Sequence, residues 1–190
     1  MLLTRSLTSL LLIALIVLFS SPVRADYQQA FSNYSDQYSK YRTVYSQFTV
    51  ARSAYQTYRT LAAQNTAITS FRKVLQTRNA LVSAYYDLLQ EKLNSTTSVD
   101  PLDISAFGEI NNNTKLWLKE NNDKIAASAS IEDLNSVSSE FAQRYPQMLI
   151  DSKQTIGRVL LAQGTYLDNR LSYVTLEVKN FLTVLAQDND

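Results

Sequence analysis

The sequence has no cysteine and no histidine, and it has only three glycines and three prolines. Without cysteine no disulfide can form, so packing alone has to hold the folded chain together. Without histidine the commonest general base and metal ligand is missing, and neither a Ser-His-Asp triad nor a Cys-His pair can form within one chain. We therefore expect a protein that is not an enzyme and that holds no metal or cofactor.

Other patterns that bind nucleotides or metals are also missing. There is no glycine-rich phosphate loop, no HExxH motif and no calcium-loop spacing. The closest carboxylate pairs are Asp100 with Asp103 and Glu132 with Asp133, and both occur where helix capping explains them.

The first 25 residues have the order of a secretory signal peptide. Arg5 gives a positive start, residues 10–19 are an unbroken apolar run, and Val23 and Ala25 stand at the −3 and −1 positions of a cleavage site before Asp26. A retained membrane anchor is the alternative, but the apolar run is about half the roughly 20 residues that a spanning helix needs. We expect cleavage near Ala25 and an exported mature chain, whether periplasmic, cell-surface or secreted.

The first half of the mature chain has a heptad pattern. Glycine and proline are absent between Pro22 and Pro101, which favours an uninterrupted helix. Aromatic residues recur every seven positions, with Phe31, Tyr38 and Tyr45 on the interleaved positions, and an apolar series follows after a one-residue slip in phase between Tyr55 and Leu61. We expect one very long helix over 27–94 with coiled-coil character. The two series are Tyr27, Tyr34, Tyr41, Phe48 and Tyr55, then Leu61, Ile68, Leu75, Val82 and Leu89.

The second half predicts shorter helices. After a polar turn at 95–100, Asp100 and Pro101 suit the start of a helix over 101–127. Ser130 and Asp133 form a capping pair for a helix over 131–145, which Pro146 ends or kinks. A last helix over 147–187 carries a heptad series of Leu160, Leu167, Val174 and Phe181, interleaved with Leu171, Val178 and Leu185.

These elements predict a fold of the all-α class. We expect a single domain over 26–190, an elongated antiparallel helical bundle in which the very long N-terminal helix packs on the shorter C-terminal helices.

Charge is distributed unevenly along the mature chain. Removing Arg5 and Arg24 leaves 16 basic and 17 acidic side chains, yet residues 37–86 hold seven basic side chains and no acidic one, while residues 93–190 have a net charge of −5. We interpret the acidic C-terminal helices as the counterpart of this basic span. The alternative is an external polyanion, such as anionic lipid or a cell-wall polymer, bound by Arg42, Arg52, Arg59, Arg72, Lys73 and Arg78. Nothing in the total charge indicates nucleic acid.

Tyrosine is concentrated near the start, where seven of the twelve lie between Tyr27 and Tyr58. The structural interpretation is a half-polar bundle core, because a buried ring can still place its hydroxyl at the edge. The functional interpretation is an exposed stripe that docks a protein or stacks on a glycan. The residues predicted to bind a partner are Tyr27, Tyr34, Tyr38, Tyr41, Tyr45, Phe48, Tyr55 and Trp117.

Trp117 is the only tryptophan, and it stands between Leu116 and Leu118. Three consecutive apolar side chains on a helix cannot all face one way. Burial of Trp117 under the bundle is the favoured interpretation, and contact with a partner or a membrane surface is the alternative.

The predicted function is that of a non-enzymatic, exported scaffold or interaction protein of the cell envelope or exterior. It would bind a protein partner, or self-associate, through the tyrosine-rich N-terminal helix. A holdase-like chaperone for exported chains and a binder of anionic lipid or wall polymer are the two alternatives.

Overall fold

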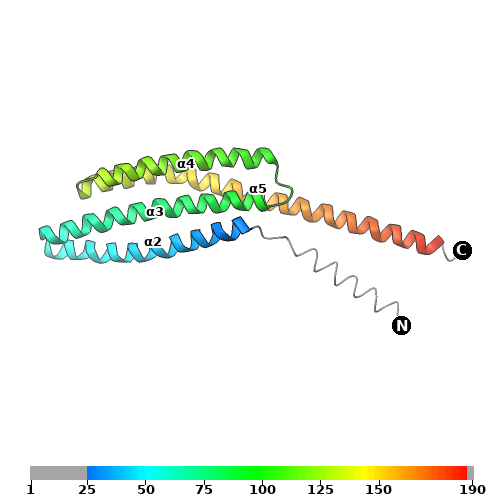
Figure 1. Cartoon of the computed structure of the whole chain (residues 1–190), viewed down its shortest axis with the longest axis horizontal. Coiled ribbons are helices and arrows are strands. Elements are labelled where there is room, and N and C mark those ends of the chain that lie inside the picture. Colours follow the sequence, from blue (N-terminus) through cyan, green and yellow to red (C-terminus); the bar gives the residue numbers. More distant parts are fainter. Residues whose placement is uncertain (1–24, 188–190) are drawn as a thin grey trace, which may run out of the picture.

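The described part of the chain, residues 25–187 of a computed structural model, consists of four helices with short connections (Figure 1). They are α2 (Ala25–Tyr58), α3 (Leu61–Ser95), α4 (Pro101–Ala127) and α5 (Ile131–Gln187). The all-α class is confirmed. Except for Ala25, the first residue of α2, the predicted signal peptide lies outside the described residues.

The predicted continuous helix over 27–94 is wrong, because the chain reverses between α2 and α3 (Figure 1). Arg59 has φ of 50°, in the left-handed region that ends helices, and its N–H donates to Tyr55 O at 3.0 Å. Thr60 then caps α3, since its hydroxyl accepts from Ala63 N–H at 3.2 Å. The reversal falls where the heptad series changes phase, between Tyr55 and Leu61.

Helix α3 is the centre of the molecule. It contacts α2, α4 and α5, whereas α2 contacts α3 alone among the described helices. The tyrosine-rich segment therefore packs on the second half of what was predicted as its own helix. The prediction that it lies against the acidic C-terminal helices is wrong for α2; α3 is the helix that contacts them.

Two apolar clusters hold α3, α4 and α5 together. The larger centres on Tyr86 and Phe107, whose stacked rings lie 5.7 Å apart between centroids. The Tyr86 hydroxyl also donates to Met148 O at 3.1 Å, which joins α3 to α5. The smaller cluster consists of Leu75, Ile125, Leu134 and Val137. The core is thus concentrated at the interface of the last three helices.

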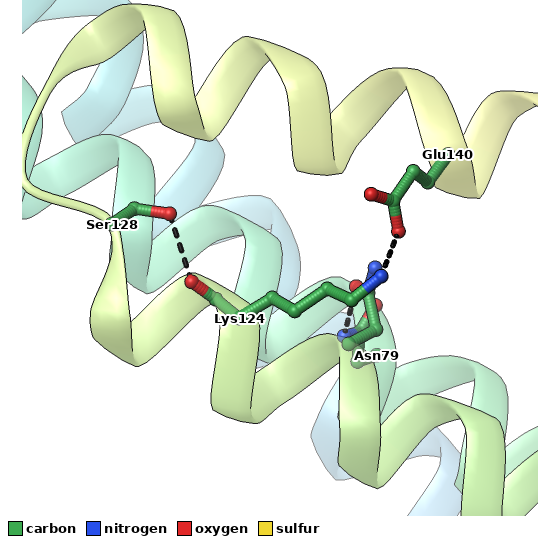
Figure 2. Close-up of polar contacts among 5 residues, drawn as sticks. Asn79, Lys124, Ser128 and Glu140 are labelled. Carbon is green, nitrogen blue, oxygen red and sulfur yellow. Dashed lines mark hydrogen bonds and ion pairs between the residues drawn. The ribbon is translucent and has the colours of Figure 1, made fainter.

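A buried asparagine pair lies between these helices. Asn79 on α3 donates to Asn121 Oδ1 at 2.8 Å and to Asn122 Oδ1 at 2.9 Å, and both Asn79 and Asn121 are 1% exposed. Figure 2 also shows the ion pair of Lys124 with Glu140, 2.7 Å long, which joins α4 to α5. Buried amides of this kind favour one register of packing, because any shift leaves them without partners.

Helix α5 continues through Pro146, so the predicted end at this residue and the separate helices over 131–145 and 147–187 are wrong. A proline inside a helix removes one backbone hydrogen bond. Phe141 before it and Met148 after it are both buried in the larger cluster. Packing on both sides therefore offsets the loss.

The starts of α4 and α5 are capped by the side chains that the sequence predicted. Asp100 accepts from Leu102 N–H at 2.8 Å at the start of α4, where Pro101 stands in the first turn. At the start of α5, Asp133 N–H donates to Ser130 Oγ at 3.0 Å while the Asp133 carboxylate accepts from the N–H groups of Ala129 and Ser130. Both capping predictions are confirmed.

The C-terminal part of α5 extends beyond the other helices (Figure 1). Ala162 is buried, and none of the residues over 163–183, where the described side chains end, is buried. Only Tyr166 and Arg170 in this segment are half-buried.

Candidate functional site

The aromatic residues of α2 form two rows with different surroundings. The row at the first heptad position faces α3 and is half-buried: Phe48 stacks on Phe71 with 4.8 Å between ring centroids, and Tyr34 lies 5.7 Å from Tyr85. This inner row forms the interface between α2 and α3. It consists of Tyr27, Tyr34, Tyr41, Phe48 and Tyr55.

The outer row consists of Phe31, Tyr38 and Tyr45, which are 49%, 46% and 52% exposed. Its two tyrosine rings lie against the inner row, with Tyr38 6.4 Å from Tyr34 and Tyr45 5.9 Å from Tyr41 between centroids. The tyrosine stripe is therefore divided between a half-buried row and an exposed row. The inner row is core, and packing already orders the exposed rings of Tyr38 and Tyr45, which would lower the entropy cost of binding a partner.

A hollow of about 410 Å³ lies where α2 turns into α3, next to the start of α5. Phe48, Tyr55 and Phe71 supply its apolar walls, and Arg52 and Arg59 are its two cations. The Arg59 guanidinium lies 5.9 Å from the centre of the Tyr55 ring and donates from Nε to Gln56 O at 3.3 Å. The remaining lining residues are Gln56, Ala67, Ile131 and Asn135.

The two arginines of the hollow are available for a ligand. Both are exposed, and neither forms an ion pair within residues 25–187. A guanidinium group matches the geometry of a carboxylate, and the adjoining rings suit an apolar neighbour of that carboxylate. The hollow can therefore accommodate an acidic side chain that is flanked by apolar groups.

The predicted basic face is divided between two environments. Arg72 points toward the end of α4, where its guanidinium donates to Ser128 O at 2.6 Å and to Ile125 O at 3.3 Å. Arg78 lies over the Phe141 ring at 3.5 Å from its centroid, and burial lowers its pKa to about 10. Arg42, Arg52, Arg59 and Lys73 remain exposed.

The inward arginines also show how the basic span is accommodated. Arg72 binds the last carbonyl groups of α4, where the helix dipole is negative, rather than a carboxylate. Arg78 on α3 reaches α5, where its Nη1 donates to Ser138 Oγ at 3.4 Å and its guanidinium lies over the Phe141 ring. Acidic side chains are therefore not what these two arginines bind.

Trp117 is half-buried on α4. Its ring lies 5.9 Å from Phe141 between centroids, and the Arg144 guanidinium lies 5.0 Å over it. Leu118 is buried and Leu116 is 61% exposed, so the three neighbours do face different ways. Because α4 does not contact α2, Trp117 is not part of the aromatic surface on α2.

Some residues of this site were not among those predicted. Phe31 belongs to the outer row, and its position on the same heptad series as Tyr38 could have included it. Phe71, Ile131 and Asn135 line the hollow only because the chain reverses at Arg59, and no sequence signal marks them.

The described residues offer neither a cluster of metal ligands nor a membrane-spanning helix. Over residues 25–187 there is no group of three or more acidic side chains that could hold a metal ion. Within the same range no helix has an apolar stretch long enough to cross a membrane.

Comparison with protein-family models, with curated proteins and with solved structures gives no match to this chain.

Proposed function

We propose that this protein is a non-enzymatic, exported interaction module that binds a protein partner through α2. The observation that carries the proposal is the outer aromatic row, Phe31, Tyr38 and Tyr45, leading to a hollow with two arginines that have no ion-pair partner within the described chain. Aromatic residues and arginine are the side chains most enriched where binding energy is concentrated.

The chemistry of the site defines the kind of partner. An acidic side chain would enter between Arg52 and Arg59, and apolar side chains beside it would cover Tyr45 and Phe48. Charge-assisted hydrogen bonds to a desolvated carboxylate contribute about 1.5–3 kcal/mol each. The partner is therefore a protein segment that combines acidic and apolar residues.

Export to the cell envelope or exterior is part of the proposal and is supported by the pattern of residues 1–25. The finer features of the fold belong here as well. We propose an elongated, antiparallel bundle with coiled-coil packing, supported by the heptad series on α2, α3 and α5.

A protein partner is favoured over a polyanion by the placement of the basic residues. Arg72 and Arg78 are engaged inside the bundle, so the exposed cations are fewer and more widely spaced than a polymer-binding face requires. Those that remain on α2 lie among aromatic rings.

Photo-crosslinking in the source cell tests the proposal. A photoreactive residue replaces Tyr38 or Tyr45 in one pair of variants and Lys119, exposed on α4, in the control. We expect the same adduct from both α2 positions and none from Lys119, and we expect Arg52→Ala with Arg59→Ala to reduce it about tenfold or more. Equal adducts at all three positions, or none at any, would contradict the proposal.

A holdase-like chaperone is the second candidate function, and the exposed apolar side chains on the C-terminal part of α5 favour it. Its test is the aggregation of an unfolded exported protein with and without the purified chain. If the variant with both Arg52→Ala and Arg59→Ala still suppresses aggregation, the result would favour the chaperone over the interaction module that binds through α2.

A further inference from the structure

The projecting segment of α5 has an apolar face that no other helix of the described chain covers. Leu167, Leu171, Val174, Val178 and Phe181 are between 41% and 65% exposed. A surface helix of a globular protein normally buries such a stripe, since apolar area in water costs free energy. The segment, which we call the arm, comprises residues 160–183.

The apolar positions of the arm alternate with the spacing of a two-stranded seam. Leu160, Leu167, Val174 and Phe181 occupy one heptad position, and Gly164, Leu171 and Val178 occupy the other. Alternating steps of four and three residues are what a single partner helix requires. Leu161 and Leu182, 73% and 58% exposed, border the seam on one side.

Gly164 is the exception among the seam residues. Glycine in a helix is less stable than alanine, so a glycine there needs a reason. A Cβ atom at Gly164 would meet nothing within 4 Å, so packing among the described residues does not require glycine at this position. The space beside Gly164 is open to solvent.

We propose that the arm pairs with the arm of a second copy of this chain, and that the two run antiparallel. In the register that places Leu171 opposite the partner's Val174, Leu167 lies opposite the partner's Val178. The same register places Gly164 opposite the partner's Phe181. The largest side chain of the seam then fills the space left by its only glycine, and the symmetry of the pair makes this happen twice.

Charged residues support the same register. Residues that flank an antiparallel seam on one side face each other, and here Arg170 faces the partner's Glu177, again twice by symmetry. A shift by one heptad in one direction would bring Arg170 opposite the partner's Arg170. A shift in the other direction would bring Glu177 opposite the partner's Glu177. Both neighbouring registers are therefore penalised by like charges.

The flank of the seam opposite Arg170 and Glu177 is apolar in this register. Leu161 faces the partner's Leu182, so the two most exposed leucines beside the seam cover each other. A parallel pair would instead bring two Phe181 rings together, leave Gly164 opposite the partner's Gly164, and place Glu177 next to the partner's Leu182. The antiparallel arrangement therefore pairs the largest side chain of the seam with its glycine, leucine with leucine, and arginine with glutamate.

A membrane surface suits the arm less well. Helices that lie on membranes carry many lysines and arginines on their polar face. The arm has Arg170 and Lys179, and these are balanced by Asp168 and Glu177. The inference goes beyond the proposed function, since it concerns a different surface from that of α2.

The first test is the mass of the chain from Asp26 to its C-terminus, measured by light scattering after size exclusion at micromolar concentration. We expect the mass of two chains, and we expect Leu167→Glu or Leu171→Glu to weaken the dimer about a hundredfold or more, because each places a charge in the apolar seam. Leu176→Glu is the matched control, since Leu176 is 54% exposed on the same helix but lies outside the seam.

Charge exchange tests the register. Arg170→Glu alone, or Glu177→Arg alone, should weaken the dimer about fivefold to tenfold. The variant with both changes restores the opposite charges and should return to the wild-type affinity. Because all these residues lie on the arm, outside both apolar clusters, the bundle itself should keep its circular dichroism spectrum.

Orientation is tested with a spin label at Thr183→Cys, which the absence of any other cysteine makes selective. In the antiparallel register the two labels lie about 30 Å apart along the helix axis at 1.5 Å per residue. Short distances would overturn the antiparallel arrangement. A wild-type chain with the mass of a monomer, or a dimer that Leu167→Glu leaves unchanged, would overturn the inference as a whole, and neither outcome bears on binding by α2.

Discussion

The buried asparagine pair between α3 and α4 gives the sharpest prediction on stability. Replacing Asn79 with alanine removes hydrogen bonds to Asn121 and Asn122. Each is expected to contribute about 1 kcal/mol, and leaving the buried Asn121 amide unpaired costs about 1–3 kcal/mol more. The free energy of unfolding of Asn79→Ala should therefore be lower by about 3 kcal/mol, which corresponds to a fall in Tm of roughly 10 °C.

The same pair is incompletely satisfied. Asn79 Oδ1 and Asn121 Nδ2 are buried and have no hydrogen-bond partner in the described structure. Replacing both asparagines with leucine would remove these two unpaired groups and both ends of the Asn79–Asn121 hydrogen bond, and it would leave only Asn122 Oδ1, on a half-buried residue, without its partner. We therefore expect the double variant to be at least as stable as the wild type. The double variant should lose specificity of packing, seen as broader NMR lines, rather than stability.

Urea unfolding followed by circular dichroism measures the free energy of unfolding of the wild type, of Asn79→Ala and of the double leucine variant. The comparison holds provided that the slope of this free energy against urea concentration is the same in all three. Asn112→Ala is the control, since Asn112 lies on α4 but is exposed, and it should change stability by less than about 0.5 kcal/mol. A loss below about 1 kcal/mol in Asn79→Ala, or a double leucine variant less stable than that single variant, would refute the reasoning.

Three further predictions concern the core and the helix starts. Phe107→Ala should lower the free energy of unfolding by about 3–5 kcal/mol, because Phe107 is fully buried, whereas Leu102→Ala, at 77% exposed, should change it little in the same urea titration. Thr60→Ala removes the cap of α3 and should cost about 1 kcal/mol, measured in the same way; no change would mean that the cap does not stabilise α3. Hydrogen bonds from the Ser130 side chain, and then from backbone N–H groups, hold the pKa of Asp133 below its ordinary value of 3.8. Their contribution is present above that value and is lost as pH falls through the lower pKa of the folded state. Acid titration of the urea midpoint should therefore show a shallower decline in Asp133→Asn, and parallel curves would contradict the assignment.

Local signals in the sequence were sufficient for the fold class and for several helix ends. The near absence of glycine and proline predicted an all-helical chain, and Asp100 with Pro101 predicted the start of α4. These features act through neighbouring backbone groups, so they depend little on the rest of the fold.

The two errors in helix continuity have the same physical origin. Arg59 takes a left-handed conformation without being glycine, and Pro146 stays inside a helix. In both cases contacts between distant residues outweigh local preference: packing of α2 on α3 offsets the cost at Arg59, and burial of Phe141 and Met148 offsets the cost at Pro146. A single sequence does not show such contacts.

The candidate site was predicted only in part, and the reason is geometric. The heptad pattern located the aromatic residues on α2, but it could not distinguish the inner row from the outer row before the position of α3 was known. The hollow needs Arg52 from α2, Phe71 from α3 and Ile131 from α5 together, and these come close only through the reversal at Arg59. The same holds for Arg72 and Arg78, which the sequence suggested as surface cations.

The attachment of α2 to a single neighbour has a consequence for how the molecule opens. Every contact that α2 makes with another described helix is with α3, while α3, α4 and α5 share two apolar clusters that contain no α2 residue. We expect α2 to detach at a lower free energy than is needed to unfold the remaining three helices, so that its amide protons exchange with solvent first. A ligand held in the hollow, between α2 and the start of α5, would bridge the part that opens and the part that stays folded. Binding should then slow amide exchange along α2 far from the contact itself.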